Sequence, residues 1–456
     1  SDSELIGISF MTPHFDRAVQ ISKALKKGKP DTPLVWGGIH AISRTEEALE
    51  YADAVCLGEG EEALVQLAQC LVAGKDYFGA KNFVFKKDDT IIRNPLLPLI
   101  SDINKLPFLD YALEDDWVND KSGKSFIKVD AKAMENLMMP FEDRDGNYHR
   151  SYRTMATRGC PHSCSYCGNS TLKSLYHGQR FLRRRSNQHI IKELEQSKAK
   201  YPFVGHIHFF DDTFFSASTE SIIEFSRMYR ERIDLPFHAN CSPITINQEK
   251  YDALIDAGMV NIDIGLQSGS KKTMQIYNRK ETADQFLNAT WIIHSHSDKL
   301  KRFDVHIILD NPWEGYDDLK ATMDVILKIP KPRTILPSGL IFFPGTKISE
   351  MAFEKGLSED LILKSFRQHL STPSAGYINY VFFLSSFNAV PNFVIKFLFS
   401  KIFYDTFNKK EFNRLFGVAY EATRLFAQLM RVLGAIRKGK ISRKLKYIKY
   451  IRLRQK

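Results

Sequence analysis

Three cysteines lie close together in the segment RGCPHSCSYCGN, and their spacing is the most specific chemical signal in the sequence. Cys160, Cys164 and Cys167 form a CxxxCxxC pattern, and an aromatic residue, Tyr166, precedes the third cysteine. Thiolates at this spacing can hold three irons of a 4Fe–4S cluster from one short loop. The fourth iron then stays open for a substrate or cosubstrate, and an open position is what distinguishes a catalytic metal from a structural one.

Two other readings of these cysteines remain open. A three-cysteine zinc site needs a fourth ligand, and His162 and His177 lie nearby in the sequence. The cysteines can also be buried and chemically inert. The other three cysteines are scattered, which indicates no disulfide framework and predicts a reducing, cytoplasmic location: Cys56, Cys70 and Cys241.

The cysteine segment resembles the cluster loop of radical S-adenosylmethionine enzymes. The resemblance implies that Cys160, Cys164 and Cys167 ligate the cluster and that Tyr166 packs near the adenine of S-adenosylmethionine. In this family the cosubstrate chelates the open iron, and an electron from the cluster cleaves it to a 5′-deoxyadenosyl radical. The resemblance also implies an external electron donor, such as flavodoxin or ferredoxin.

Residues 151–350 alternate between predicted strands and amphipathic helices. This repetition fits the partial parallel (β/α) barrel of the radical family, in which sites lie at the carboxyl ends of strands. The predicted strands include HIHFF, FHANC, NIDIGLQ, RFDVHIIL and ILPSGL.

Polar residues at two of these strand ends, and one arginine further along the chain, match positions that bind S-adenosylmethionine in the family. Asp211 and Asp212 follow IHFF, where relatives hold the amino group; a helix cap plus a surface acid is the alternative. Gln267 and Ser268 end the next-but-one strand, where relatives usually carry Glu-Ser, so a ribose contact there would lack a charge. Arg279 matches the arginine that pairs with the methionyl carboxylate, and a guanidinium fork suits that group.

Two further features of the barrel segment bear on the substrate. Asp310 and Asn311 replace the small residues that relatives carry after the fifth strand, which we interpret as a clue to specificity. Four histidines occur on predicted strands and are expected to line the barrel interior as substrate contacts or satisfied core residues, rather than to bind a further metal: His206, His208, His238 and His306.

Residues 1–75 also alternate between strands and helices, which predicts a doubly wound parallel sheet. Ligands bind at the carboxyl ends of such strands. The segments IGISFMT, WGGIHA and DAVCLGEGEEAL resemble the later part of the cobalamin-binding domains that precede many radical enzymes. The resemblance implies cobalamin contacts from six residues at these strand ends: Ser9, Thr12, Gly37, Gly38, Gly58 and Gly60.

Some features of a complete cobalamin-binding domain are missing. The sequence begins without Met at an apparent core strand and has no DxHxxG motif, whose histidine would ligate cobalt. We expect a truncated start, or cobalamin bound without a protein ligand. The glycines can also be ordinary turns.

The remaining segments are a connector over residues 76–150, with a predicted hairpin at FVFKKDDTIIRN, and a helical extension over residues 351–456. Part of the extension is rich in Phe, which suits a core helix pair, a cover over the substrate or an interfacial helix. No signal peptide and no apolar stretch of about 20 residues is visible.

The positive charge is concentrated at the C-terminal end. The net charge is +11, and residues 431–456 contain 11 basic and no acidic residues, so residues 1–430 are neutral. Basic residues interleaved with Ile, Leu and Tyr suit an anionic membrane surface or nucleic acid, although a solvated tail is the alternative. The neighbouring Phe-rich segment favours the membrane, which predicts peripheral contact with its inner face and a small-molecule or lipid-like substrate.

Together these features predict an α/β protein in which a truncated cobalamin-binding domain precedes a radical-type barrel and a helical extension. The predicted function is cobalamin-dependent methylation of an unactivated carbon. Radical cyclisation, rearrangement or oxidation within the same superfamily remains open, as does a non-catalytic iron–sulfur redox or binding role. The sequence assigns no catalytic acid or base.

Overall fold

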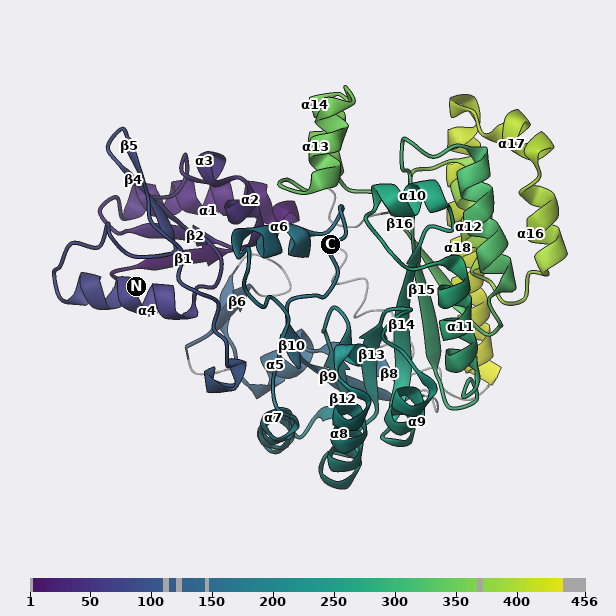
Figure 1. Cartoon of the computed structure of the whole chain (residues 1–456), viewed down its shortest axis with the longest axis horizontal. Coiled ribbons are helices and arrows are strands. Elements are labelled where there is room, and N and C mark those ends of the chain that lie inside the picture. Colours follow the sequence, from purple (N-terminus) through teal and green to yellow (C-terminus); the bar gives the residue numbers. More distant parts are fainter. Residues whose placement is uncertain (1–2, 110–114, 120–124, 144–146, 367–371, 438–456) are drawn as a thin grey trace.

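A computed structural model describes residues 3–109, 115–119, 125–143, 147–366 and 372–437. An N-terminal α/β unit lies beside a large curled sheet, and a layer of helices closes the far side of that sheet (Figure 1). The helix that follows the three cysteines, α6 (Gly168–Leu175), lies between the N-terminal unit and the curled sheet.

The N-terminal unit is a five-stranded sheet in the order β1-β2-β3-β4-β5, with β1 to β3 parallel and β4 and β5 an antiparallel hairpin. Alternate residues of β2 and β3 enter two separate cores, with Trp36 and Val55 on one face and Val35 and Ala54 on the other. Helices therefore cover both faces, which confirms the doubly wound arrangement. The elements are β1 (Ile6–Ser9), α1 (Phe15–Gly28), β2 (Leu34–Gly37), α2 (Ile39–Ser43), α3 (Thr45–Ala48), β3 (Ala54–Cys56), α4 (Glu61–Val72), β4 (Phe83–Lys87) and β5 (Thr90–Arg93).

The connector predicted over residues 76–150 divides between the two sheets. Its hairpin, β4 and β5, extends the N-terminal sheet to Arg93, so the boundary drawn at residue 75 falls before two strands of the same sheet. Its last strands belong to the curled sheet. Between them lie β6 (Trp117–Asn119), β7 (Phe126–Lys128) and α5 (Ala131–Leu137).

The curled sheet has seven strands in the order β16-β15-β14-β13-β12-β9-β8, and all neighbours are parallel except β8 and β9. It confirms the predicted partial barrel. The strands are β8 (Met139–Glu142), β9 (Tyr148–Thr154), β12 (Val204–Phe209), β13 (Phe237–Cys241), β14 (Met259–Gln267), β15 (Arg302–Leu309) and β16 (Thr334–Gly339).

Helices run around the outside of this sheet (Figure 1). On β14, Ile262, Ile264 and Leu266 are buried in the core beneath these helices. Asp263 and Gln267 alternate with them and therefore face the concave side. The helices are α7 (Asn187–Lys200), α8 (Thr219–Arg232), α9 (Gln248–Asp256), α10 (Lys271–Ile276), α11 (Ala283–His294) and α12 (Tyr316–Lys328).

The C-terminal extension is helical, as predicted. The Phe-rich segment divides, because α15 places Tyr377 and Phe382 in the core of the curled sheet while much of α16 is exposed. No described helix is long and apolar enough to cross a membrane. The helices are α13 (Lys347–Glu354), α14 (Glu359–Phe366), α15 (Tyr377–Ser385), α16 (Asn392–Leu398), α17 (Lys401–Phe407) and α18 (Asn413–Arg437).

Candidate active site

The three cysteines lie on one loop between the short strand β10 (Thr157–Arg158) and α6. Cys167 is the residue before the first turn of α6, and its amide donates a hydrogen bond to the Cys164 carbonyl at 3.2 Å. Gly159 opens the loop with a φ of +84°, and a Cβ there would lie 2.4 Å from the Phe181 carbonyl oxygen. Only glycine fits this position, so the chain turns sharply just before the first cysteine.

The thiols of this loop are unpaired and electrostatically linked. None of the three is in a disulfide. Burial, with smaller contributions from Asp212 and Cys164, raises the pKa of Cys160 to about 12 and that of Cys167 to about 11. Thiols with pKa values this high ionise readily only when a bound metal centre stabilises the thiolate.

The donor set fits an iron–sulfur cluster, in which each thiolate of one loop binds a different iron. Among the described residues, no group of three His, Cys, Asp or Glu side chains converges on a single metal-ion position.

Arg279 connects this loop to the carboxyl end of β14. Its Nη1 lies 3.9 Å from Cys164 Sγ and 3.4 Å from Tyr166 Oη, and its Nη2 donates to the Gly265 carbonyl at 3.2 Å. Nη2 also pairs with Glu281 at 3.0 Å, and the two side chains are 8% and 2% exposed. A buried positive charge therefore lies beside the cysteines, held by a carboxylate that the sequence did not single out.

Several polar atoms around Arg279 are buried without a partner. They are Arg279 Nε, Glu281 Oε2 and His162 Nε2. Buried polar atoms normally find hydrogen-bond partners, so atoms left free beside a cavity are suited to a ligand. His162 was considered as a zinc ligand from the sequence, but its Nδ1 lies 3.7 Å from Glu281.

The structure separates the predicted acidic pair into two roles. Asp211 is fully buried and accepts hydrogen bonds from the Ala156 amide at 3.0 Å and from Thr157 Oγ1 at 2.5 Å. It braces the strand that leads into the cysteine loop and has no accessible surface for a cosubstrate. Asp212 is exposed and interacts with Asn169 in the first turn of α6. Contact of Asp212 with S-adenosylmethionine stays a prediction.

Gln267 and Ser268 also point in different directions. Gln267 has a φ of +64°, which is rare for a residue with a side chain, and the strand register shifts between Gly265 and Gln267. The bulge folds the Gln267 amide over Gly265 on the concave face, where a Cβ at Gly265 would lie 2.4 Å from Gln267 Nε2. Ser268 is 2% exposed and donates to Glu314 at 3.0 Å, so its hydroxyl faces the wall of the barrel.

A cavity of about 280 Å³ opens beside these residues. Arg279 and Glu281 are among its polar lining residues, together with Lys271, Gln275 and Thr282, and most of the rest is apolar, including Leu266 and Phe286. A mainly apolar cavity with a few convergent polar groups is typical of small-molecule sites. It lies at the carboxyl end of β14, where sites of parallel barrels are found.

The predicted interior histidines form a connected row across the concave face. The rings of His208 and His238 stack at 4.1 Å. Asp263 accepts hydrogen bonds from His238 Nε2 at 2.8 Å and from His306 Nε2 at 3.1 Å. His206 lies apart from the row, stacked on Phe141 at 3.7 Å.

The charges within this row follow from its contacts. Burial opposes ionisation of Asp263, but the hydrogen bonds from His238 and His306 outweigh it and lower its pKa. Burial also opposes the charge on His306, yet Asp263 raises its pKa above the usual value. Burial, and then the neighbouring His238, lower the pKa of His208 to about 3. The concave face therefore holds an anionic centre, a histidine that protonates readily and a neutral histidine.

Asp310 and Asn311 anchor neighbouring segments. Asp310 accepts hydrogen bonds from the Ser374 amide and hydroxyl and from Asn379 Nδ2, each at 2.7 Å. Asn311 donates to Tyr277 Oη at 3.2 Å. Asp310 thus ties the end of β15 to α15 of the C-terminal extension.

The six predicted cobalamin-binding residues lie together along the carboxyl ends of β1, β2 and β3. Ser9 is exposed, whereas Thr12 is buried. This edge faces the cysteine loop, since the Glu59 amide donates to Tyr176 Oη at 3.0 Å and the Glu59 carboxylate pairs with Arg183 at 2.8 Å.

The close backbone approaches predicted at the glycines are made to protein atoms. A Cβ at Gly38 (φ +88°) would lie 2.4 Å from the Phe10 carbonyl oxygen, and one at Gly58 (φ +73°) would lie 1.8 Å from Tyr176 Oη. Both glycines are therefore required by the fold. Cobalamin contact at this edge stays a prediction.

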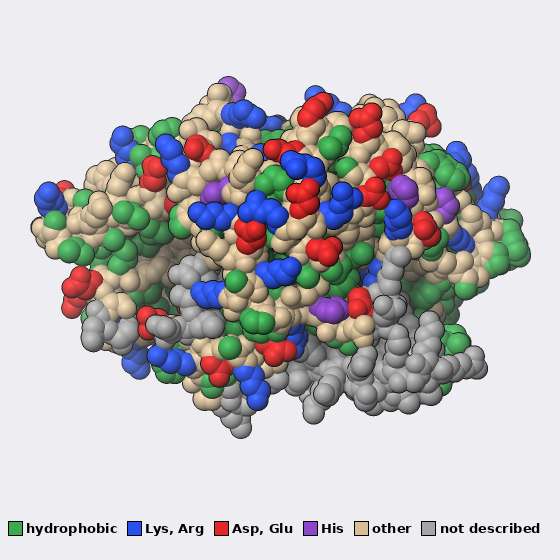
Figure 2. All heavy atoms as spheres, turned by 90° about the horizontal axis from the view of Figure 1, so that it is seen from below, with side chains coloured by type: hydrophobic (Ala, Val, Ile, Leu, Met, Phe, Trp, Pro, Cys, Tyr) green, Lys and Arg blue, Asp and Glu red, His purple; other side chains and the backbone are tan. Residues whose placement is uncertain are grey.

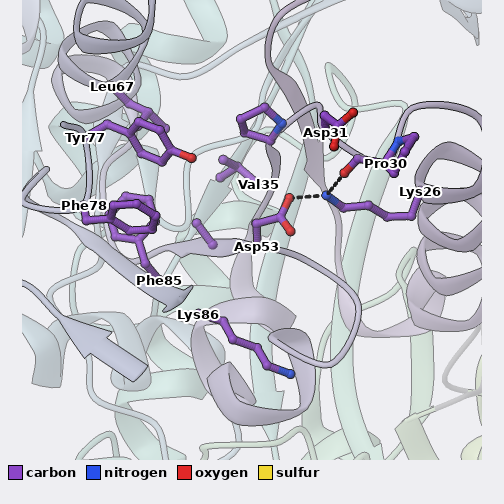
Figure 3. A pocket seen from close by; sticks show the side chains of 12 residues that line it. Lys26, Pro30, Asp31, Val35, Asp53, Leu67, Tyr77, Phe78, Phe85 and Lys86 are labelled. Atoms are coloured by element: carbon purple, nitrogen blue, oxygen red, sulfur yellow. Dashed lines mark hydrogen bonds and ion pairs between the residues drawn. The ribbon is translucent and has the colours of Figure 1, made fainter. Parts of the chain in front are cut away.

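A second cavity, of about 170 Å³, lies at the opposite edge of the N-terminal sheet (Figure 3). Val35 and Ala54 line it at the amino ends of β2 and β3, Phe85 of β4 lines it as well, and the Lys26–Asp53 ion pair lies at one side. Because the glycine loops are at the other edge, this cavity is not part of the candidate site.

Comparison with known proteins agrees with this arrangement. Residues 154–323 match the radical SAM superfamily and residues 1–68 match the B12 binding domain. An uncharacterized methyltransferase of Pyrococcus horikoshii is 24% identical over 363 residues, which are 78% of this chain and 71% of that protein. An anaerobic magnesium-protoporphyrin IX monomethyl ester cyclase of Cereibacter sphaeroides is 23% identical over 61% of this chain and 42% of that protein.

Two solved structures share the fold. The radical S-adenosylmethionine methyltransferase TsrM of Kitasatospora setae, with cobalamin and a [4Fe-4S] cluster bound, has a TM-score of 0.58 at 16% identity and covers 78% of this chain and 67% of its own. The cobalamin-dependent S-adenosylmethionine radical enzyme OxsB, with aqua-cobalamin bound, has a TM-score of 0.53 at 16% identity. The match covers 79% of this chain and 48% of OxsB.

The structure thus combines a radical-type barrel with a doubly wound domain beside it. The barrel is the curled parallel sheet together with the cysteine loop. The chain contains a radical SAM domain over residues 154–323 and a B12 binding domain over residues 1–68, before the barrel. These two domains imply S-adenosylmethionine, its iron–sulfur cluster and cobalamin as cofactors.

Proposed function

We propose that this enzyme uses cobalamin and a 4Fe–4S cluster to methylate an unactivated carbon of a small molecule. One observation carries the proposal: the loop edge of the B12 binding domain packs directly on the segment that follows the cysteine loop. Glu59 reaches both Tyr176 and Arg183 across this contact. Cofactors held by the two loops would therefore lie close to each other, as methyl transfer between them and a substrate requires.

Different residues would bind the cluster and S-adenosylmethionine. Cys160, Cys164 and Cys167 would hold the cluster, and Arg279 with Glu281 would receive the polar end of S-adenosylmethionine. When bound, the cluster supplies one electron for cleavage of S-adenosylmethionine, and cobalamin supplies the methyl group. The electron comes from an external donor such as flavodoxin or ferredoxin.

The substrate would lie on the concave face of the barrel. His238, Asp263 and His306 form a polar row there, on the same face of the sheet as Gln267 and deeper along the strands. A substrate resting on this row has hydrogen-bonding or ionisable groups, because imidazole and carboxylate side chains recognise such groups.

The test uses S-adenosylmethionine with an isotopically labelled methyl group. The protein is reconstituted anaerobically with iron, sulfide and hydroxocobalamin, reduced, and incubated with an extract of the host. Mass spectrometry should find one extract component that gains a labelled methyl group only when enzyme and cobalamin are both present. A component that loses hydrogens without gaining the label would show ring formation or oxidation instead.

Ring formation is the second candidate because the cyclase of Cereibacter sphaeroides is among the relatives. Methyl transfer is favoured, because an uncharacterized methyltransferase matches over a larger share of both chains.

A further inference from the structure

Within the part of the chain that the structure describes, one side of the long C-terminal helix α18 packs on the body of the protein. The ring centroids of Phe416 and Tyr377 are 4.9 Å apart, and those of Tyr420 and Phe383 are 4.2 Å apart. Thr423 is within hydrogen-bond distance of Tyr380 Oη at 3.0 Å. These three residues follow each other at helical spacing and define the face that α15 covers.

A second face of α18 is apolar and exposed. At 100° per residue its members fall within one stripe of the helix, separate from both the packing face and the polar face that carries Glu421 and Arg424. They are 41% to 64% exposed: Leu415, Val418, Leu425, Phe426, Leu429, Met430 and Leu433. We name this set the α18 stripe.

Other exposed apolar side chains lie at the same end of the molecule. Phe393 and Phe397 on α16 are 74% and 62% exposed, and Ile402 on α17 is 78% exposed. Hydrophobic side chains gather at the right-hand end of Figure 2, the end where Figure 1 places α16 and α17. So much exposed apolar surface at one end of the molecule indicates a contact with another body.

The distribution of charge in the sequence indicates the chemistry of the partner that binds this apolar surface. The α18 stripe runs directly into residues 431–456, which contain 11 basic and no acidic residues, and of which 438–456 lie outside the described residues. An apolar stripe followed by concentrated positive charge suits anionic lipid. A second copy of this chain would bring a like charge of +11 to the same place.

We propose that the α18 stripe binds the surface of an anionic lipid bilayer. The helix lies in the plane of the interface, with Phe426 and Leu429 among the acyl chains. The enzyme would thus be held peripherally at a membrane. This contact is independent of the methyl-transfer chemistry proposed above.

Flotation with defined vesicles tests the contact. The whole chain is mixed anaerobically with vesicles of phosphatidylcholine, or of phosphatidylcholine with phosphatidylglycerol, and spun through a density gradient. The protein should float with the anionic vesicles and not with the neutral ones, and added salt should weaken its binding. The double variant Phe426→Ser and Leu429→Ser should bind the anionic vesicles at least about tenfold more weakly than the unaltered protein.

Trp291→Ser is the matched control, because Trp291 is 58% exposed on α11, a helix outside the barrel. This variant should float like the unaltered protein. Equal flotation of the double variant and the unaltered protein would overturn the proposal, as would failure of the unaltered protein to float. If the double variant instead converts a dimer to a monomer in sedimentation, a second copy covers the stripe and the proposal is wrong.

Discussion

At the scale of single residues, the site combines groups whose spacing identifies them with groups that only folding brings together. Cys160, Cys164 and Cys167 could be found from their spacing alone. Glu281 and Asp263 could not, because an isolated acid in a sequence is usually a solvated surface charge. Their roles arise from burial beside Arg279 and between two histidines.

The Arg279–Glu281 pair should be important for stability. Glu281→Gln leaves a buried guanidinium without its carboxylate, which should lower the free energy of unfolding by about 3 kcal/mol. Urea unfolding of the metal-free protein, followed by circular dichroism, measures the loss. Glu195→Gln removes a carboxylate from an ion pair with Arg232 whose side chains are 39% and 40% exposed, and should cost less than about 1 kcal/mol. Equal losses in the two variants would contradict the assigned burial.

Glu314 should make stability depend on pH. Burial raises its pKa to about 7, although hydrogen bonds from Thr273 and Ser268 oppose the shift. Below the pKa of the unfolded chain both states are protonated and the carboxyl costs nothing. Between that pKa and about 7 the unfolded chain ionises while the folded state keeps its proton, so stability falls by up to about 3 kcal/mol and then becomes constant.

Glu314→Gln removes this ionisation. Relative to the unaltered protein, the variant should therefore gain stability between pH 5 and pH 8, as measured by urea unfolding at a series of pH values. A difference between the two proteins that does not change with pH would show that Glu314 is not held protonated.

At the scale of elements, the strands and helices could be predicted from the sequence. The tertiary contacts made by residues at the strand ends could not. Asp211 follows a strand as predicted, yet tertiary burial turns it into a brace for the cysteine loop. Asp310 anchors α15, a helix more than sixty residues later in the chain. The hairpin of β4 and β5 joins the first sheet because Phe83 and Phe85 complete its core. Contacts this distant leave no local pattern.

The contact between the B12 binding domain and α6 should be sensitive to Gly58. In Gly58→Ala the new Cβ would lie 1.8 Å from Tyr176 Oη, so the two elements must separate. Gly74→Ala is the matched control, because Gly74 has a similar positive φ of +60° and nothing within 4 Å. Both variants bear the backbone strain of about 1 kcal/mol, and Gly58→Ala should lose about 1–3 kcal/mol more.

Thermal unfolding and limited proteolysis measure this difference. Gly58→Ala should also become more susceptible to cleavage between the two units. If it behaves like Gly74→Ala, the loop edge does not pack on α6 as described.

At the scale of the whole molecule, two sheets present their loop edges to each other across the cysteine loop. This arrangement explains why residues far apart in sequence, such as Glu59 and Arg183, form a part-buried ion pair. It also places the concave face of the barrel next to both predicted cofactor loops. Radical chemistry needs such a shielded space, because reactive intermediates must be kept from water and oxygen.

The central claim is that the three cysteines hold a redox-active cluster that cleaves S-adenosylmethionine. Anaerobically reconstituted protein is reduced with dithionite, supplied with S-adenosylmethionine and analysed for 5′-deoxyadenosine by mass spectrometry. The unaltered protein should form it, and the variant with Cys160, Cys164 and Cys167 all changed to Ala should lack both the brown cluster absorbance and the product. Full cluster content in that variant, or no 5′-deoxyadenosine from an unaltered protein with its cluster intact, would contradict the account.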